Sequence, residues 1–382
     1  MGILRQCKKS VWEFVIICRV MIWHRMMSCM TVLPFAVAAH ACDLADAALS
    51  AFTRASDEAD DAPRLQRALD ATSNGVVSIP AGVYEIGATV LVTNHCSLLM
   101  HKNAILKAIR PMEFVLKVNN APVDRAYARL DFGTFVKGGR IDGNGLASCM
   151  ALDGFWHYTL RDTSFLNGKK FGLRVHGEAG GCELIAQNLY FICKVRGLAG
   201  NTGLCVMGGD GHYTDIVVVD YTVGVHALRG SANRFTRCHV WGGAVPPAKK
   251  GEPREMLKDS INFWIGEKAS ANIFRDCYAD TGTVGFLNEG WDTRIFGCSY
   301  FWNKRLDSKQ DAVVFKQPCG SMLVSGFRMS KAIPNLKTYE GCNRVTWSDM
   351  LYSGDKIDRD NDFMPARCTF NGGTSSNQKT AK

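Results

Sequence analysis

The sequence predicts an all-β fold in which the chain winds into a solenoid of strand coils. Its 37 glycines and 30 Phe and Tyr residues, with few runs of helix formers, indicate strands joined by tight turns. From residue 150 onward the chain also repeats loosely, roughly every 20 to 40 residues, as a solenoid does. Most repeats contain two strand-like segments, which is the pattern of a parallel β-helix.

Composition and charge limit the partners of the chain. Its 382 residues, 47% of them apolar, can bury the core of one large domain or two small ones. The formal charge is +9, but residues 1–41 hold five Lys and Arg and one Glu, so 40 basic and 35 acidic residues remain and the charge falls to +5. This excess is compatible with an acidic polysaccharide. The chain lacks runs of Lys and Arg, so we expect no nucleic acid partner.

Residues 1–41 are predicted to be a signal peptide. An uncharged apolar segment runs from Met26 to Ala41 and closes with Ala39-His40-Ala41, a small-x-small cleavage site, before Cys42. The segment is shorter than the roughly 20 residues that a membrane span requires. We therefore expect export, to the periplasm or the medium, rather than a stable membrane span.

A short helix followed by strands is predicted next, with a cap at residues 55–75 and the first coil from residue 76. Asp61 is suited to cap this helix, and Asn74-Gly75 is suited to end it. The apolar face of the helix is formed by Leu65, Ala68 and Leu69.

Two segments carry a resemblance to a known superfamily. One is Gly75-Val76-Val77 followed by Ile79-Pro80-Ala81-Gly82-x-Tyr84, and the other is Gly138-Gly139-Arg140-Ile141-Asp142-Gly143-Asn144-Gly145. They closely resemble the cap and first coils of the pectate-lyase-like proteins, which include polygalacturonases and phage tailspike depolymerases. The resemblance implies a right-handed, single-stranded parallel β-helix over residues 42–370, with a short N-terminal capping helix and a polysaccharide as partner.

Two registers of strand-like segments recur along the coils, which we expect to reach about residue 355. The first register contains residues 157–166, 182–191, 213–222, 232–241, 271–280 and 293–301. The second contains residues 171–177, 202–209, 223–230 and 284–290, with 313–317 as a looser member. Within the first register, Ser231-Ala232-Asn233-x-Phe235-x-x-Cys238 returns as Ser270-Ala271-Asn272-x-Phe274-x-x-Cys277.

Period-two alternation predicts which side chains of these segments point outward. If Val219, Cys238, Cys277 and Cys298 point inward, the first outward column is Ser164, Asn188, Asp220, His239, Tyr278 and Ser299. The column two residues further along is Leu166, Tyr190, Thr222, Trp241, Asp280 and Phe301. The second register gives the column Arg174, Cys205, His226 and Leu287, beside His176, Met207, Leu228, Glu289 and Lys316. Members of a column touch, because adjacent coils are about 4.8 Å apart.

Cys238, Cys277 and Cys298 are predicted to stack as small apolar side chains inside the solenoid. The alternative is a disulfide between neighbouring coils, which requires a specific geometry that a continuous stack rarely offers. The chain contains no Cys-x-x-Cys pair and no His-x3-His pair, so we assign no metal site.

Residues 244–258 interrupt two well-matched coils. They carry three Pro and six charged residues directly after Trp241, and we expect them to project as a loop. The loop either walls a substrate groove or is a solvated insertion. Residues 371–382 are polar and are predicted to be a disordered tail.

The resemblance implies two reaction classes, but the motifs that distinguish them are missing. Glycan hydrolysis requires paired carboxylates, whereas uronate elimination requires a base and a cation that neutralises the sugar carboxylate. Asp60-Asp61 is the one Asp-Asp pair, and it lies in the cap; Gly211-His212 is followed by Tyr213 rather than by Gly. The pectate-lyase pattern of Asp-His with a downstream Arg-x-Pro-x-x-Arg is absent. Neither active site can be carried over.

Two clusters remain as candidate sites, each with a solvated solenoid face as its alternative. The first combines acid, base and sugar-stacking groups: Asp220, His239, Tyr278, Asp280 and Trp241. The second is a basic-rich column suited to an anionic sugar, with Glu289 or a His as base: Arg174, His176, His226, Glu289 and Lys316. Asp210 and His212, in a Gly-rich corner, can contribute to substrate binding, although such a run is first of all a turn.

The leading hypothesis is an exported enzyme that degrades an acidic polysaccharide. A lyase is favoured because His, Tyr and Arg are plentiful in the predicted columns while paired carboxylates are scarce. A hydrolase of polygalacturonase type and a non-catalytic glycan-binding protein are the alternatives. No cofactor is assigned, although a lyase can require Ca²⁺. The oligomeric state is left open.

Overall fold

The structure is a computed structural model. It describes residues 46–120, 133–155, 157–176, 183–195, 198, 200–242, 244–245, 255–257, 259–302, 312–330, 336–341, 345–348, 351–353 and 369–371. The predicted signal peptide, most of the predicted loop at 244–258 and the predicted tail beyond 371 lie outside these residues.

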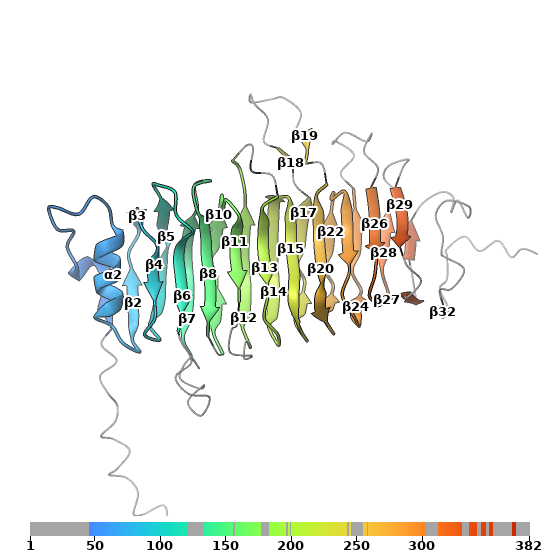
Figure 1. Cartoon of the computed structure of the whole chain (residues 1–382), viewed down its shortest axis with the longest axis horizontal. Helices are drawn as coiled ribbons and strands as arrows, with labels where there is room; N and C mark the ends of the chain where they lie inside the picture. The colour runs from blue at the N-terminus through green and yellow to red at the C-terminus, as the bar shows by residue number, and fades with distance from the viewer. Residues whose placement is uncertain are drawn as a thin grey trace, which may run out of the picture. The chain divides into compact units, whose positions relative to one another are not determined.

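The described residues from Asp46 onward form a right-handed parallel β-helix, as predicted (Figure 1). The described strands form two long parallel sheets, in which each strand pairs with the equivalent strand of the next coil. Strands of the ten-stranded sheet are β4 (Val90–Val92), β6 (Phe114–Asn119), β8 (Ser148–Gly154), β11 (Phe171–Val175), β13 (Thr202–Val206), β15 (Val223–Ser231), β20 (Ile261–Ser270), β23 (Val284–Asn288), β26 (Ala312–Gln317) and β29 (Leu336–Gly341).

The twenty-stranded sheet covers the other two sides of each coil. Its strands are β1 (Ala47–Ala48), β2 (Val76–Ile79), β3 (Gly82–Ile86), β5 (Ser97–Ala108), β7 (Phe135–Asp142), β9 (Thr159–Arg161), β10 (Ser164–Leu166), β12 (Ile185–Ile192), β14 (His212–Tyr221), β16 (Arg234–Thr236), β17 (His239–Gly242), β21 (Ile273–Arg275), β22 (Tyr278–Asp280), β24 (Thr293–Phe296), β25 (Ser299–Phe301), β27 (Met322–Ser325), β28 (Arg328–Ser330), β30 (Val345–Ser348), β31 (Leu351–Ser353) and β32 (Thr369–Asn371). Within the predicted loop, β18 (Ala244–Val245) and β19 (Glu255–Met256) pair antiparallel.

Single residues in the left-handed conformation bend the chain between the two short strands of a coil. Arg237 (φ 51°), Asp276 (φ 52°) and Gly297 (φ 61°) occupy this bend in three successive coils. In each coil the following cysteine points into the core, and the residue after it begins the next short strand with an outward side chain. The bend therefore decides which side chains reach the outer face.

The repeated segments 231–238 and 270–277 form internal ladders. The Asn272 side-chain oxygen accepts the backbone N–H of Asn233 at 3.1 Å, and the Phe235 and Phe274 rings stack with centroids 4.7 Å apart. All four side chains are fully buried. The Asn ladder gives buried polar groups the hydrogen bonds that they would otherwise lose to water. The Phe ladder fills the core with stacked rings.

The cysteine stack is confirmed. Cys238, Cys277 and Cys298 are buried free thiols, and the Cys277 N–H lies 3.2 Å from the Cys298 sulfur. Burial raises the pKa of the Cys238 and Cys298 thiols far above the usual range, which keeps them protonated and unreactive.

One pair of glycines is required by a close backbone approach. Gly138 (φ 81°) and Gly139 (φ 62°) in β7 lie against β5, where the strand register shifts between Met100 and Ile105. A Cβ atom on Gly138 would lie 2.2 Å from the Met100 carbonyl oxygen. Only glycine allows this kink without displacing the neighbouring strand.

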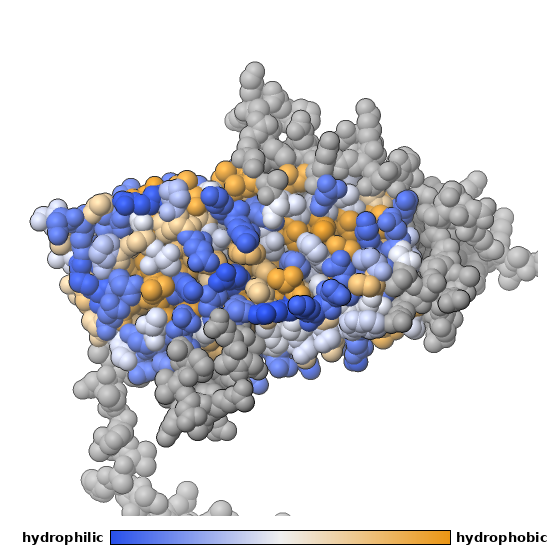
Figure 2. Space-filling view, viewed as in Figure 1, coloured by the Kyte–Doolittle hydropathy of each residue, from blue (hydrophilic) through white to orange (hydrophobic). Residues whose placement is uncertain are grey.

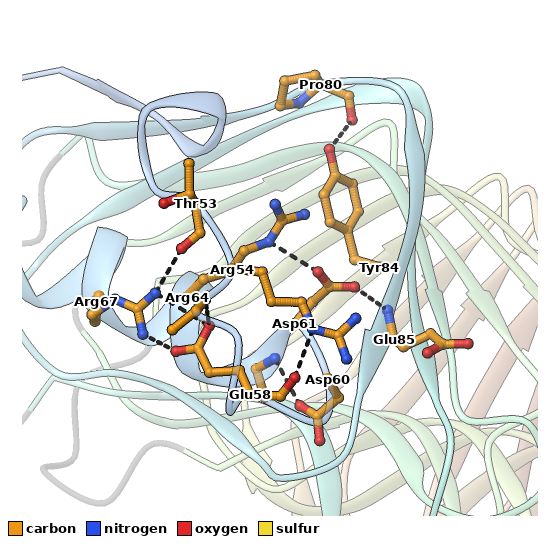
Figure 3. A network of polar contacts seen from close by, with 12 residues as sticks. Thr53, Arg54, Glu58, Asp60, Asp61, Arg64, Arg67, Pro80, Tyr84 and Glu85 are labelled. Carbon is orange, nitrogen blue, oxygen red and sulfur yellow. Dashed lines mark hydrogen bonds and ion pairs between the residues drawn. The ribbon is translucent and has the colours of Figure 1, made fainter.

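The helix α2 (Ala62–Asp70) caps the first coil with Leu65, Ala68 and Leu69 buried, as predicted. Asp61 occupies the N-cap position, but its carboxylate accepts the Glu85 N–H at 2.7 Å and pairs with Arg64 (Figure 3). The side chain that caps the helix is Asp60, which accepts the Ala62 N–H at 2.9 Å. Asp61 thus joins the helix to the first coil, where a neighbouring Asp can take over the capping.

The predicted end of this helix is also corrected. The helix ends at Asp70, with Ala71 as its C-cap, before the predicted Asn74-Gly75. Asn74 (φ 55°) instead forms a separate left-handed turn into β2. A short 3-10 helix, η1 (Leu49–Ala51), precedes α2. No helix in the described part of the chain is long and apolar enough to cross a membrane.

We expect Phe274→Ala to lower the free energy of unfolding by about 3 to 5 kcal/mol, because it opens a cavity between stacked rings that cannot collapse. Phe301→Ala is the matched control, since that side chain is 40% exposed, and we expect it to cost far less. Urea unfolding of both variants measures the difference. Equal effects would contradict the dependence of the coils on this ring stack.

Candidate functional site

The strand pairing places His239, Tyr278 and Ser299 side by side on three successive coils, as predicted. Ser164 also lies in this column, as predicted, but Asn188 and Asp220 do not. The column reads Ser164, Tyr190, Val217, His239, Tyr278, Ser299 and Arg328. The neighbouring column reads Asp142, Leu166, Ile192, Val219, Trp241, Asp280 and Phe301.

Asp220 is not part of this outer column. It is an extra residue in the left-handed conformation (φ 60°), between Val219, which pairs with Trp241, and Tyr221, which pairs with Gly242. Its side chain is buried. Asn188 (φ 54°) forms a bend in which its exposed amide donates to Asp162 at 2.7 Å, and Tyr190 takes its place in the column. Val219 points outward rather than into the core. Period-two counting fails at these places because each left-handed residue adds one position.

His239, Tyr278 and Asp280 form one contact group on β17 and β22. The His239 imidazole stacks on the Tyr278 ring with centroids 4.7 Å apart, and its Nε2 lies 3.4 Å from the Asp280 Oδ2. The other carboxylate oxygen of Asp280 accepts a hydrogen bond from the Thr281 hydroxyl. The His239 side chain is 40% exposed, so this group can reach a ligand in solvent.

The environment of Tyr278 keeps its phenol protonated. Burial, and secondarily the negative charge of Asp280, raises the pKa of Tyr278 to about 12. The phenol is therefore a hydrogen-bond and proton donor throughout the neutral range. An imidazole held by a carboxylate beside such a phenol supplies both a base and an acid at one place.

Aromatic and small side chains border this group. Trp241 and Phe301 flank Asp280 in its column, and the Phe301 ring, which is 40% exposed, lies 6.3 Å from the Tyr278 ring. Sugar rings stack on such amphipathic aromatic surfaces. The neighbour of Tyr278 in its own column on the next coil is the small Ser299.

The second predicted column lies on the ten-stranded sheet. It reads Lys117, Ala151, Arg174, Cys205, His226, Trp264, Leu287, Lys316 and Glu340. Lys316 therefore lies within the column rather than beside it. The sequence analysis did not identify Trp264, because its strand begins shortly after the irregular 244–258 segment. The alternation of apolar residues from Ile261 onward could have indicated this strand.

Arg174 is held by acidic neighbours. Its guanidinium forms two hydrogen bonds of 2.8 and 2.7 Å to Asp153, lies 3.5 Å from Glu113, and packs on the Phe114 ring. Burial alone would raise the pKa of Asp153, but hydrogen bonds from Arg174 and Lys117 outweigh it and hold the pKa below the usual range. These charges compensate one another.

His226 is the buried member of the column. It is 8% exposed, its ring stacks on Trp264 with centroids 4.2 Å apart, and its Nε2 has no hydrogen-bond partner among the described residues. Burial lowers the pKa of His226 to about 4, so it is neutral near pH 7. The Trp264 indole N–H donates to Glu289 at 2.8 Å, which ties the predicted base Glu289 to this sheet and not to His239.

The other predicted binding residues are dispersed. His176 contacts the Arg229 guanidinium, and Lys316 pairs with Glu340 at 3.6 Å. Asp210 (φ 56°) is an exposed corner residue, as a turn requires, and the exposed His212 begins β14. In the part of the chain that the structure describes, no group of three or more His, Cys, Asp or Glu side chains is placed to hold a metal ion.

Comparison with known proteins shows the fold alone. No protein-family model and no curated protein sequence matches the chain. The endo-xylogalacturonan hydrolase from Aspergillus tubingensis is similar in structure, with a TM-score of 0.51 and 14% identity over 86% of this chain and 100% of the hydrolase. The Geobacillus virus E2 protein ORF18 has a TM-score of 0.47 and 12% identity over 86% of this chain, which spans only 60% of the viral protein. The GH87 α-1,3-glucanase from Streptomyces thermodiastaticus has a TM-score of 0.45 and 14% identity over 87% of this chain and 69% of the glucanase.

Acid should destabilise the fold through His226. The folded-state pKa of about 4 lies below the ordinary value of 6.5, so the unfolded chain takes up the proton first. Stability is therefore lost as the pH falls from about 6.5 to about 4, by up to roughly 3 kcal/mol. His226→Phe keeps the stack on Trp264 without a titrating group.

Urea unfolding at pH 7 and pH 4 measures this effect. We expect a smaller loss of stability in His226→Phe than in the unmodified chain. The control His212→Phe replaces an exposed imidazole and should leave the loss unchanged. The assignment fails if both variants lose as much stability as the unmodified chain.

Proposed function

We propose that the chain is an exported polysaccharide lyase that cleaves an acidic, uronate-containing polymer at His239, Tyr278 and Asp280. The observation that carries the proposal is the contact of an accessible imidazole with both a carboxylate and a protonated phenol. Export is supported by the apolar segment at residues 26–41. The similar fold of an enzyme named for a polysaccharide substrate, xylogalacturonan, supports the choice of polymer.

Elimination assigns a separate task to each group. His239 removes the proton from the carbon next to the sugar carboxylate, and Asp280 stabilises the imidazolium that results. The electron pair of the broken C–H bond forms a C=C bond, and the C–O bond to the leaving sugar breaks. The neutral Tyr278 phenol donates its proton to the departing oxygen, and proton exchange with solvent restores both residues.

Arg328 supports an acidic substrate. It lies two coils beyond Tyr278 in the same column, across the small Ser299, or about 10 Å along the solenoid. Its side chain is exposed and forms no ion pair with a described carboxylate. A guanidinium in this position can bind the carboxylate of a uronate and disperse the charge that develops on elimination.

The spacing of carboxylates favours elimination over hydrolysis. In the described residues of the Asp280 column, the nearest second carboxylate is Asp142, five coils away, or about 24 Å. Glycosidases place their two carboxyl groups roughly 5 to 9.5 Å apart. A single carboxylate beside an imidazole and a phenol suits elimination.

Incubation with acidic and neutral polysaccharides, with and without Ca²⁺, tests the proposal. Ultraviolet absorbance of the unsaturated product and new reducing ends should appear together. Reducing ends without absorbance would mean a hydrolase. Binding without either signal would mean a glycan-binding protein.

His239→Gln and Tyr278→Phe should each lower kcat by about 100-fold or more, because each removes a proton-transfer group. Trp241→Ala should mainly raise KM, because it removes a stacking surface. His101→Gln, which changes an exposed histidine on β5, is the control and should keep full activity. Steady-state kinetics on the polymer that is cleaved would contradict the site if His239→Gln matched the control.

A further inference from the structure

Thr281, directly after Asp280, occupies a strained backbone position. Its φ is 53°, and it is the one β-branched residue with a positive φ in the part of the chain that the structure describes. Two earlier coils have a left-handed residue at the same place, directly after their member of the Asp280 column. These residues are Asn167 (φ 53°), after Leu166, and Asp220 (φ 60°), after Val219. Asn and Asp tolerate this conformation, whereas the Thr side chain clashes with its own backbone.

The side chain of Thr281 makes a contact that explains this cost. It is fully buried, and its hydroxyl donates a hydrogen bond to the Asp280 Oδ1. This leaves the other oxygen, Oδ2, facing the His239 Nε2 at 3.4 Å. An Asp in place of Thr281 would instead put a second negative charge beside Asp280.

The backbone on both sides of Thr281 is fixed by the core. The Thr281 N–H donates to the Phe301 carbonyl at 2.7 Å, and the Asn262 amide donates to the Asp280 carbonyl at 3.2 Å. The Tyr300 hydroxyl donates to the Gly282 carbonyl at 2.9 Å. The hydroxyl of Thr281 is therefore delivered to Asp280 from a rigid segment.

We propose that Thr281 is a positioning residue, whose hydroxyl holds the Asp280 carboxylate toward His239. The proposal rests on the proposed function, because it assigns a task within the same group. This positioning role explains why a strained Thr stands at residue 281. Asn or Gly would relieve the backbone strain there but would not supply the hydroxyl. Thr281 is buried and does not touch a substrate, so its effect should fall on kcat rather than on KM.

Three substitutions at Thr281 separate positioning from a structural role. Thr281→Val keeps the shape and removes the hydroxyl, Thr281→Ser keeps the hydroxyl, and Thr281→Gly relieves the strain. The matched control is Thr283→Val, which makes the same change two residues away, where the hydroxyl bonds Ser260 at 3.3 Å. For each variant, kcat, KM, the melting temperature and the NMR shifts of the His239 ring nitrogens are measured.

We expect kcat to fall about tenfold in the Val and Gly variants, with KM within about twofold, and to recover in the Ser variant. The Gly variant should melt at or above the temperature of the unmodified chain, so its loss of kcat cannot come from unfolding. The His239 nitrogen shifts should change in the Val and Gly variants and return in the Ser variant. The control should leave kcat, KM, the melting temperature and the His239 nitrogen shifts unchanged.

The outcomes distinguish this proposal from the proposed function. If the polymer is cleaved and kcat is unchanged in Thr281→Val, or follows the melting temperature across the variants, the positioning role is overturned and the lyase stands. If no polymer is cleaved but the His239 shifts follow the hydroxyl, the lyase is overturned and the positioning of Asp280 stands. Shifts that do not respond to the hydroxyl overturn the positioning role in either case.

Discussion

The parallel pairing of each coil with the next is the constraint on which the rest of this protein depends. Adjacent coils are about 4.8 Å apart, so an inward side chain has its counterpart in van der Waals contact above and below. Phe235 and Phe274 use this spacing to stack, and the Asn272 side-chain oxygen uses it to accept the backbone N–H of Asn233. The same spacing brings His239 onto Tyr278 on the outside. The same strand register therefore sets both the packing of the core and the arrangement of the candidate site.

Left-handed bend residues determine how that register reaches the surface. A bend such as Arg237 or Asp276 turns the chain with a single residue and reverses the side-chain alternation. Asp220 does this within a continuous strand, β14, directly after Val219, and so removes itself from the outer face where Val219 lies beside Trp241. At the equivalent bend of a later coil stands Thr281, whose hydroxyl is used by Asp280. The bends thus turn the chain within each coil and also determine which side chains lie in the candidate site.

The two outer faces differ in how their charged groups are used. On the ten-stranded sheet, Arg174 and Lys117 both form ion pairs with Asp153, and the Glu289 carboxylate accepts the indole N–H of Trp264. His226 on that face is buried and neutral near pH 7. On the twenty-stranded sheet, His239 is accessible and in contact with both a carboxylate and a phenol. Proton transfer to a bound polymer requires accessible groups, which is why we place the reaction there. Figure 2 shows hydrophilic and hydrophobic residues interspersed over one face of the solenoid.

The sequence by itself determined the solenoid, its capping helix, the cysteine stack and the alignment of His239 with Tyr278, because these depend on local patterns that repeat from coil to coil. It also placed Trp241 beside Asp280, since three-residue strands such as β22 leave no room for a shift in register. Tertiary structure alone decided that Asp220 is buried, that Glu289 binds Trp264, and that Arg328 lies in the Tyr278 column. Bends and insertions change the count of residues per coil, and only the hydrogen-bonded pairing of strands across coils shows how many residues each one adds. The role of Thr281 was beyond the sequence for the same reason, because its backbone conformation comes from the coil around it and not from its own side chain.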